Sequence, residues 1–137
     1  MRILQLIALT GLALTQWTQA ANWPAWRGPE GNGISPEGNL PTQWSPTQNV
    51  HWRVELPEPG NSTPIVWNDR VFVTQPLSGE KKRALLCFDR KTGRELWRAG
   101  VVVETPERTH DTNPYGSSSP VTDGERVEPA LNESTVR

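Results

Sequence analysis

The side chains best suited to chemistry gather in residues 109–115, which have the sequence Thr-His-Asp-Thr-Asn-Pro-Tyr. His110 and Asp111 are residue types that bind metal ions or act as general bases. A metal site needs three or four ligands, however, and the neighbouring sequence supplies no others. These residues are therefore interpreted as part of a loop inserted between two structural units.

The other reactive residue types lack the partners that their chemistry requires. Cys87 is the single cysteine, which excludes an internal disulfide, and its apolar surroundings indicate a buried small side chain. The serines at 117–119 have neither a glycine elbow nor a paired base. The glycines of residues 28–33 precede a proline-rich segment and no helix, so a phosphate site lacks its context. We therefore assign no catalytic, cofactor-binding or metal-binding residue.

Composition restricts the elements that can position these groups. The chain has 137 residues with 13 prolines, 11 glycines and seven tryptophans. The prolines and glycines exclude a helical bundle or a coiled coil, whereas the tryptophans are too numerous for a disordered linker. The net charge of −1 gives no basic surface, so nucleic acid is not an expected partner.

The N-terminus has the pattern of an export signal. Arg2 precedes an apolar run over residues 3–14, and Thr18 and Ala20 are small residues before a cleavage point at Ala21. The run is about 12 residues long, too short to span a bilayer stably. We predict a signal peptide at 1–20, a periplasmic or extracellular location, and no membrane span after cleavage. An N-terminal anchor or a buried helix is the alternative.

Residues 21–49 form a Trp/Pro/Gly-rich arm in which the prolines exclude a helix and any central strand. We expect Trp23, Trp26 and Trp44 to pin this arm. Residues 50–56 then alternate between apolar and polar side chains, which predicts a strand.

Short β-strands follow, and no stretch shows helical periodicity, so the predicted fold class is all-β. Asn68-Asp69 is a tight-turn dipeptide between two β-rich runs. The expected strands are 63–67, 70–74, 83–89 and 94–98, with a loop at 76–80 and a turn at 90–93.

An internal repeat indicates a larger architecture. Residues 62–71 align without gaps on residues 118–127 at an offset of 56, with Ser, Pro, Arg and Val at matched positions. A second repeat relates Trp52-Arg53 to Trp97-Arg98 at an offset of 45, and the inserted loop at 101–117 accounts for the difference. Four-stranded antiparallel sheets of about 45 residues are typical of β-propeller blades. Two unrelated hairpins with similar turns are the alternative.

The sequence of residues 88–97, Phe-Asp-Arg-Lys-Thr-Gly-Arg-Glu-Leu-Trp, resembles the tryptophan-docking motif of the quinoprotein-like propellers. These proteins carry pyrroloquinoline-quinone-like (PQQ-like) repeats. Gly93 permits the turn, and Asp89 and Thr92 can hydrogen-bond its backbone. The resemblance implies that Trp97 docks on an adjoining blade.

Trp52 has the same place one unit earlier, so the resemblance implies that residues 50–56 are an outermost strand donated to the last blade. Residues 22–29 and 41–44 are similar to the N-terminal arm of exported bacterial propellers of the outer-membrane-assembly type. The resemblance spans residues 22–127. It implies the fold and does not imply the cofactor.

The expected organisation is a signal peptide at 1–20, an arm at 21–49, a partial propeller at 50–127 and an off-pattern tail at 128–137. A propeller needs at least four blades. This chain supplies a donated strand, one full blade and the start of a second, which predicts an N-terminal fragment of a longer protein. Trp52, Trp67 and Trp97 are then expected to lack the surfaces on which they pack.

The expected function is that of a non-enzymatic scaffold that binds proteins or other ligands. Other proteins are the expected partners, through the propeller surface, and no cofactor is predicted. The alternative is the N-terminal part of a quinone-dependent oxidoreductase, which would use PQQ and calcium in blades that this chain lacks. A complete small secreted binding module is a third reading.

Overall fold

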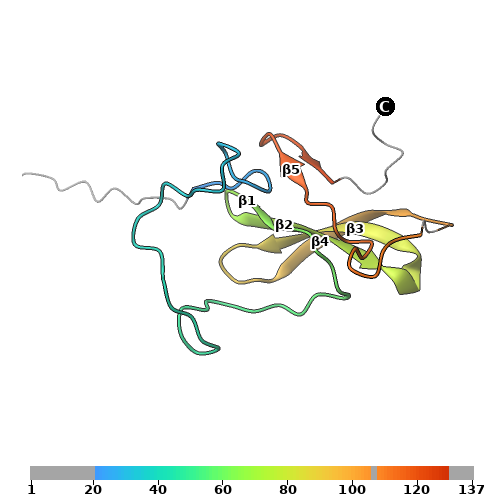
Figure 1. The fold of residues 1–137 in the computed structure, drawn as a ribbon, viewed down its shortest axis with the longest axis horizontal. Helices are drawn as coiled ribbons and strands as arrows, with labels where there is room; N and C mark the ends of the chain where they lie inside the picture. Colours follow the sequence, from blue (N-terminus) through green and yellow to red (C-terminus); the bar gives the residue numbers. More distant parts are fainter. Residues whose placement is uncertain (1–20, 106–107, 130–137) are drawn as a thin grey trace, which may run out of the picture.

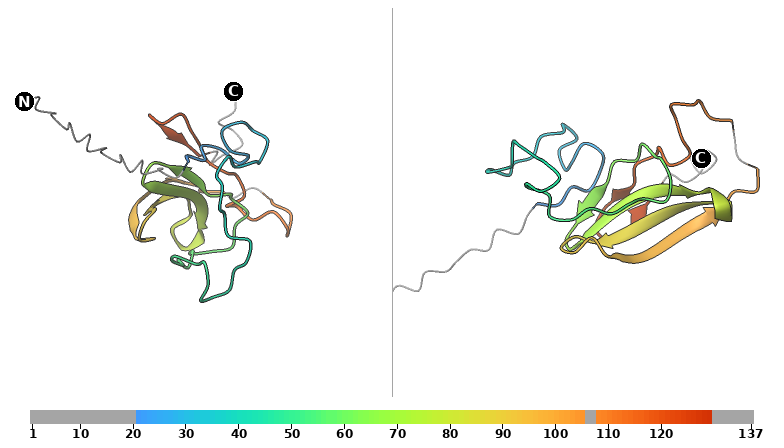
Figure 2. Two further views of the ribbon diagram at one scale, coloured as in Figure 1. Left: turned by 90° about the vertical axis from the view of Figure 1, so that its left-hand side faces the viewer. Right: turned by 90° about the horizontal axis from the view of Figure 1, so that it is seen from below.

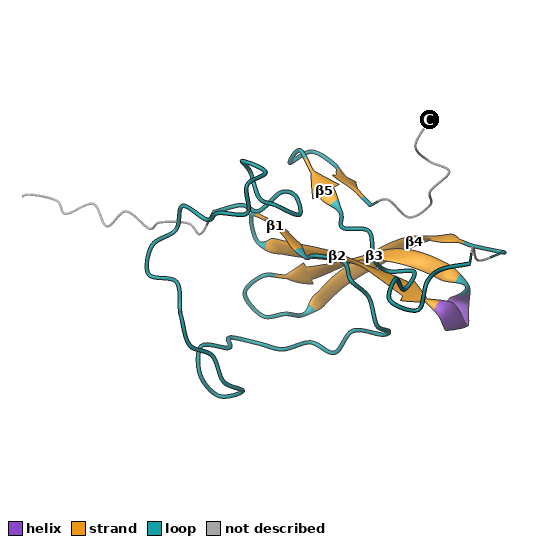
Figure 3. Ribbon diagram, viewed as in Figure 1, coloured by secondary structure: helices purple, strands orange, loops and turns teal. Residues whose placement is uncertain are grey.

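The computed structural model describes residues 21–105 and 108–129. The predicted signal peptide at 1–20 lies outside the described residues, as do residues 130–137 of the predicted tail. A four-stranded antiparallel sheet is followed by a two-stranded hairpin (Figures 1 and 3), which confirms the all-β prediction. In chain order the elements are β1 (Ile65–Trp67), β2 (Arg70–Leu77), the short 3-10 helix η1 (Ser78–Glu80), β3 (Lys82–Asp89), β4 (Glu95–Val102), β5 (Val121–Thr122) and β6 (Val127–Glu128).

The four strands of the sheet lie side by side in chain order. The turn between β1 and β2 is at Asn68-Asp69, as predicted, and Asn68 adopts a left-handed φ of 50°. Asparagine tolerates this conformation better than most residues. The backbone N–H of Arg90 donates to the carbonyl of Asp69 at 2.9 Å, which joins this turn to the turn between β3 and β4.

Strand β2 continues through Pro76 to Leu77, so the predicted end at residue 74 and the predicted loop over 76–80 are wrong for residues 75–77. Proline interrupts a strand only where its missing N–H is needed for a ladder bond. The N–H of Thr74, two residues earlier, donates to Ser62 Oγ at 3.1 Å. The N–H position of residue 76 therefore faces the same side, away from β3, because successive residues alternate. Pro76 consequently removes no bond from the β2–β3 ladder.

Strand β4 is also longer than predicted, because it includes residues 99–102. Gly100 pairs with Ala84 on β3. A Cβ atom at Gly100 would collide with the carbonyl oxygen of Arg83, so the glycine permits the close approach of the two strands.

Both faces of the sheet carry apolar clusters, because alternate residues of β2 and β3 point to opposite sides. Val54, from the extended segment before the sheet, packs against the first face, and Val127 of the hairpin packs against the second. The sheet is thus packed between an earlier and a later part of the chain. The buried members of the first face are Val73, Leu77, Ala84, Leu86 and Phe88; those of the second are Ile65, Phe72, Leu85 and Cys87.

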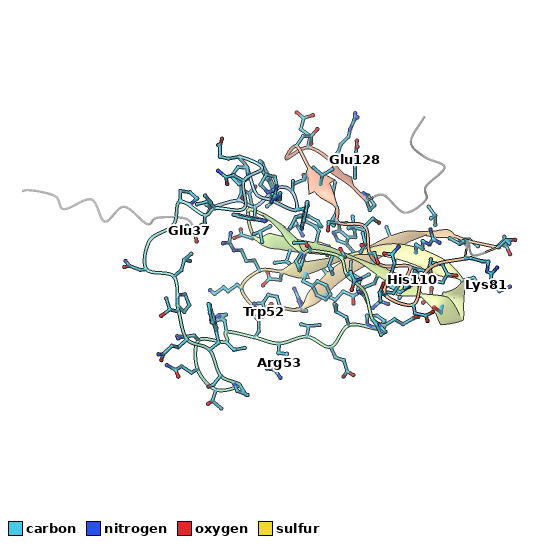
Figure 4. All side chains as sticks on the ribbon, in the orientation of Figure 1. Glu37, Trp52, Arg53, Lys81, His110 and Glu128 are labelled. Carbon is cyan, nitrogen blue, oxygen red and sulfur yellow. The ribbon has the colours of Figure 1, made fainter. Side chains whose placement is uncertain are left out.

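Residues 50–56 were expected to form a strand, and among the described residues they form none. The segment is extended, with Trp52 and Val54 half-buried and their neighbours exposed. The side chain of Trp52 points from this segment toward the sheet, and the side chain of Arg53 points away from it (Figure 4). The alternation of apolar and polar residues therefore arises because one side of the segment packs on the sheet. The segment is not paired with any of the described strands by a ladder of hydrogen bonds.

The beginning of the arm, at residues 22–24, lies beside β1 and β5 (Figures 1 and 2), and the prediction of the arm's anchors was only partly right. Trp23 is half-buried and forms an antiparallel bridge with Val66 of β1. Trp26 and Trp44 are 64% and 63% exposed, so they do not pin the arm. Proline and glycine keep this segment irregular, and a large aromatic side chain anchors it only where a surface lies beneath.

Cys87 is fully buried in β3, and burial raises the pKa of its thiol, although a hydrogen bond with Arg70 opposes this effect. This agrees with its interpretation as a small buried side chain. Within the ranges 21–105 and 108–129, no helix is long and apolar enough to cross a membrane.

Candidate functional site

His110 and Asp111, the first candidates for chemistry, lie in an exposed loop (Figure 4 labels His110). The Nδ1 atom of His110 is 2.9 Å from Thr112 Oγ1, and the His110 carbonyl accepts the N–H of Asn113 at 2.8 Å. These contacts fix a turn. In the described part of the chain, no group of three or more His, Cys, Asp or Glu side chains is arranged to hold a metal ion.

The turn between β3 and β4 is the most highly organised polar feature of the sheet. Asp89 Oδ1 accepts two hydrogen bonds of 2.7 Å, from the backbone N–H and from the hydroxyl of Thr92. The Asp89 carbonyl accepts the N–H of Gly93 at 2.8 Å, and the Asp89 N–H donates to the carbonyl of Arg94 at 2.8 Å. One aspartate therefore closes the turn through both its side chain and its backbone.

The hydrogen bonds from Thr92, first from its hydroxyl and then from its backbone, lower the pKa of the exposed Asp89 carboxyl. They stabilise the charged form selectively, because a carboxylate accepts hydrogen bonds that a neutral acid accepts less well.

This organised turn forms a seat for the indole of Trp52. The Trp52 Nε1–H donates to the carbonyl of Arg90 at 2.8 Å, across 38 residues of sequence. Gly93 is buried with a left-handed φ of 72°, and a Cβ atom there would lie 2.7 Å from the Trp52 ring. Glycine is thus required twice, for the backbone conformation and for the space that the indole occupies. We call this contact, made by Trp52 with residues 89–93, the docking contact.

Tryptophan also lies over a left-handed glycine at two further places. Trp67 of β1 contacts Gly124 in the hairpin loop, where φ is 96°, and Trp23 contacts Gly28 in the arm, where φ is 76°. The expectation that Trp52 and Trp67 lack packing surfaces is therefore wrong. Trp97, on β4, remains 41% exposed, with the ring of Phe72 at a centroid distance of 6.0 Å.

An open groove of about 510 Å³ lies between the sheet and the hairpin. It occupies the second face of the sheet, beyond the point where Val127 packs. The groove therefore separates the sheet of the first repeat from the hairpin of the second. Its apolar lining includes Trp67, Phe72, Leu85, Trp97 and Val127.

Three hydrogen bonds join the two repeats, and one of them links equivalent positions. The backbone N–H of Thr63 donates to Ser119 Oγ at 2.9 Å, and these residues correspond under the offset of 56. The Thr74 hydroxyl donates to the carbonyl of Ser118, and the N–H of Ser62 donates to the carbonyl of Gly116 at 3.0 Å. The starts of β1 and β5 consequently lie side by side.

A four-stranded antiparallel sheet that contacts a second repeat at equivalent positions, with a tryptophan docked on its turn, defines part of a β-propeller. The comparison with known families agrees with this class. The family described as outer membrane protein assembly factor BamB, a PQQ-repeat family, matches residues 35–128, and the chain belongs to this family. No curated protein and no solved structure matches the chain.

The structure brings Trp52 together with Asp89, Thr92 and Gly93, which sequence analysis had selected as the docking motif, and it leaves Trp97 outside this contact. Arg90 was not among the predicted residues, because its contribution is a backbone carbonyl that any residue supplies. The glycines beneath Trp23 and Trp67 were not predicted as packing positions either. Each of these two glycines lies among turn-forming residues, which is a signal for a left-handed backbone. Glycines in such segments are common in this chain, however, so the signal does not single them out.

Replacement of Thr92 by valine is expected to raise the pKa of Asp89 toward its ordinary value of about 3.9. Valine retains the shape and the backbone N–H but removes the hydroxyl, the largest cause of the lowered pKa. Because the folded-state pKa is lowered, the Asp89 contribution to stability is present above the unfolded pKa and is lost as pH falls through the folded value.

The measurement is an NMR titration of the side-chain carboxyl carbons. Asp123 is the internal control, because backbone N–H groups of Arg126 and Glu125 lower its pKa without any contact to Thr92. An unchanged Asp89 titration in the variant, or an equal shift of both residues, contradicts the role given to the Thr92 hydroxyl.

Proposed function

We propose that this chain is part of an exported, non-enzymatic propeller scaffold that binds other proteins. The observation that carries the proposal is that the polar side chains of the repeat hydrogen-bond within its own turns. Asp89 and Thr92 hold the turn that seats Trp52, and Asp123 accepts the backbone N–H of Arg126 at 2.8 Å in the hairpin loop. These side chains stabilise the blade and are not assigned to a reaction. We therefore assign the function to the surface of the propeller.

Exposed apolar side chains on the arm support a protein-binding role. Trp26 and Trp44 are each more than 60% exposed, and Ile34 is 67% exposed. Large apolar and aromatic residues in such positions are typical of protein interfaces. Membership of a family described as an outer membrane assembly factor supports export to the periplasm.

A quinone-dependent oxidoreductase, with its active-site residues in further blades, is the alternative function. Calcium requires about six to eight oxygen ligands, largely from carboxylates and carbonyls. Among the described residues, Asp89 and Asp123 accept hydrogen bonds within their own turns, and neither is assigned to a calcium site.

Two assays test the scaffold proposal. In the first, a longer version of the protein that includes the further blades expected of the propeller is supplied with pyrroloquinoline quinone and calcium, and dye-linked oxidation of primary alcohols is followed. The proposal predicts the same rate with and without protein, and a quinone-dependent rate would overturn it in favour of the oxidoreductase.

In the second assay, a photo-crosslinking amino acid replaces Trp26 or Trp44 in a chain expressed in a bacterial periplasm. The matched control places it at Leu86, which is fully buried. The proposal predicts a discrete adduct with another protein from the exposed positions only. No adduct from either position, or the same adducts from all three, contradicts it.

A further inference from the structure

The arm binds the free edge of β1 through its backbone. Trp23 and Val66 exchange two hydrogen bonds, Trp23 N–H to the Val66 carbonyl at 2.8 Å and Val66 N–H to the Trp23 carbonyl at 2.9 Å. Val66 is the central residue of the three-residue strand β1, whose other side pairs with β2. The arm therefore protects an edge that would otherwise be open to pairing.

The next residue of the arm binds the second repeat. The carbonyl of Pro24 accepts the N–H of Thr122, in β5, at 2.9 Å. Val66 and Thr122 occupy the same position in the two repeats under the offset of 56. Two consecutive arm residues thus bind the same backbone position in consecutive repeats.

This pairing places the arm relative to the propeller axis. Blades radiate from a central channel, so equivalent strands of neighbouring blades are closest together at the axis. Two residues of extended chain span at most about 7 Å, and here they reach both β1 and β5. The opposite edge of the sheet, β4, lies farther from the arm (Figure 2). The edges that the arm binds are consequently the inner ones.

We propose that residues 22–24 form an axial tie, which binds the inner strands of the first two blades together and places the arm on the channel side of the propeller. The tie goes beyond the scaffold function, because it assigns a binding surface, the inner strand edges, and its occupant, the arm of the same chain. The channel side of these two blades then faces the arm, in the region where a channel-bound ligand would otherwise contact the inner strands.

Contacts on both sides of residues 22–24 hold the tie in place. The N–H of Asn68, in the β1–β2 turn, donates to Asn22 Oδ1 at 2.7 Å. Gly28 is buried, and a Cβ atom there would lie 2.8 Å from the Trp23 ring. The Gly28 N–H donates to the carbonyl of Ala25 at 2.9 Å, which folds the arm back on Trp23.

Two glycines of the arm provide a matched pair of variants. Gly28 and Gly31 have similar left-handed φ values of 76° and 66°, so alanine strains the backbone similarly at both. Only at Gly28 does the added Cβ meet Trp23, since Gly31 has no atom within 4 Å of that position. The difference between Gly28→Ala and Gly31→Ala therefore isolates the effect of displacing Trp23.

The test is amide hydrogen exchange of the full-length chain, followed by NMR. In Gly28→Ala the amides of Val66 and Thr122 are expected to exchange about tenfold faster, as for the loss of one net hydrogen bond. Gly31→Ala is expected to leave both rates unchanged, and the Leu86 amide reports global unfolding. Acceleration of only one of the two amides, or an equal effect of both variants, overturns the proposal.

If Gly28→Ala prevents folding, a measurement on the unmodified chain tests the axial tie instead. Scalar couplings across hydrogen bonds are expected from Val66 N to the Trp23 carbonyl carbon and from Thr122 N to the Pro24 carbonyl carbon. Absence of the second coupling when the first is observed overturns the tie. Neither outcome depends on the oxidation or crosslinking assays, so failure of the tie and failure of the scaffold function are distinguishable.

Discussion

Replacement of Leu86 by alanine is expected to lower the free energy of unfolding by about 3 kcal/mol, the middle of the range for buried leucines. Leu86 is fully buried in β3, at the centre of the cluster on the first face of the sheet. The loss combines the hydrophobic transfer energy of the removed atoms with the cavity that they leave. Small domains have a total stability of about 5–15 kcal/mol, so this single change removes a large part of it.

Urea unfolding, followed by tryptophan fluorescence, measures this loss. The matched control is Leu40→Ala, the same substitution at a residue of the arm that is 52% exposed. It is expected to change the unfolding free energy by less than about 0.5 kcal/mol. Equal effects of the two substitutions contradict the placement of a buried core cluster on the first face of β2 and β3.

Replacement of Gly93 by alanine is expected to cost about 3 kcal/mol, from two separate causes. Alanine is strained at a φ of 72°, which accounts for about 1–2 kcal/mol. The added Cβ also displaces the Trp52 indole, with loss of its packing and of its hydrogen bond to the Arg90 carbonyl.

Gly33→Ala separates the two causes. Gly33 has a φ of 78°, close to that of Gly93, and no atom lies within 4 Å of its Cβ position. This variant is expected to show the backbone strain alone, so the difference between the two substitutions measures the docking contact. Chemical denaturation of both variants supplies the values. A difference near zero shows that Trp52 is not seated on the turn.

Local signals in the sequence were sufficient for the turns and the core strands. The Asn68-Asp69 dipeptide located the first hairpin, because few residues adopt the conformation that it needs. Asp89, Thr92 and Gly93 located the second turn for the same kind of reason. Each of these predictions depends on residues within four positions of one another, where backbone sterics and short-range hydrogen bonds decide the structure.

Features set by distant contacts were not predictable in this way. Alternation in residues 50–56 indicated a strand, but periodicity does not distinguish a paired strand from an extended segment that packs on one side. Pro76 indicated a strand end, because the local sequence does not show on which side of the strand its missing N–H lies. That side depends on how β2 pairs with β3. Trp26 and Trp23 are alike in sequence, and only the surface of β1 and Gly28 makes one of them an anchor.

The docking contact joins the segment before the sheet to the turn of the blade, and it is the contact on which the propeller interpretation most depends. Its direct measurement is a proton NOE spectrum of the unmodified full-length chain. We predict cross-peaks between the Trp52 indole ring and the α protons of Gly93, together with slow exchange of the Trp52 Nε1 proton, which donates to Arg90. A Trp52 ring without cross-peaks to Gly93, and an indole proton that exchanges as fast as in a free peptide, would contradict it.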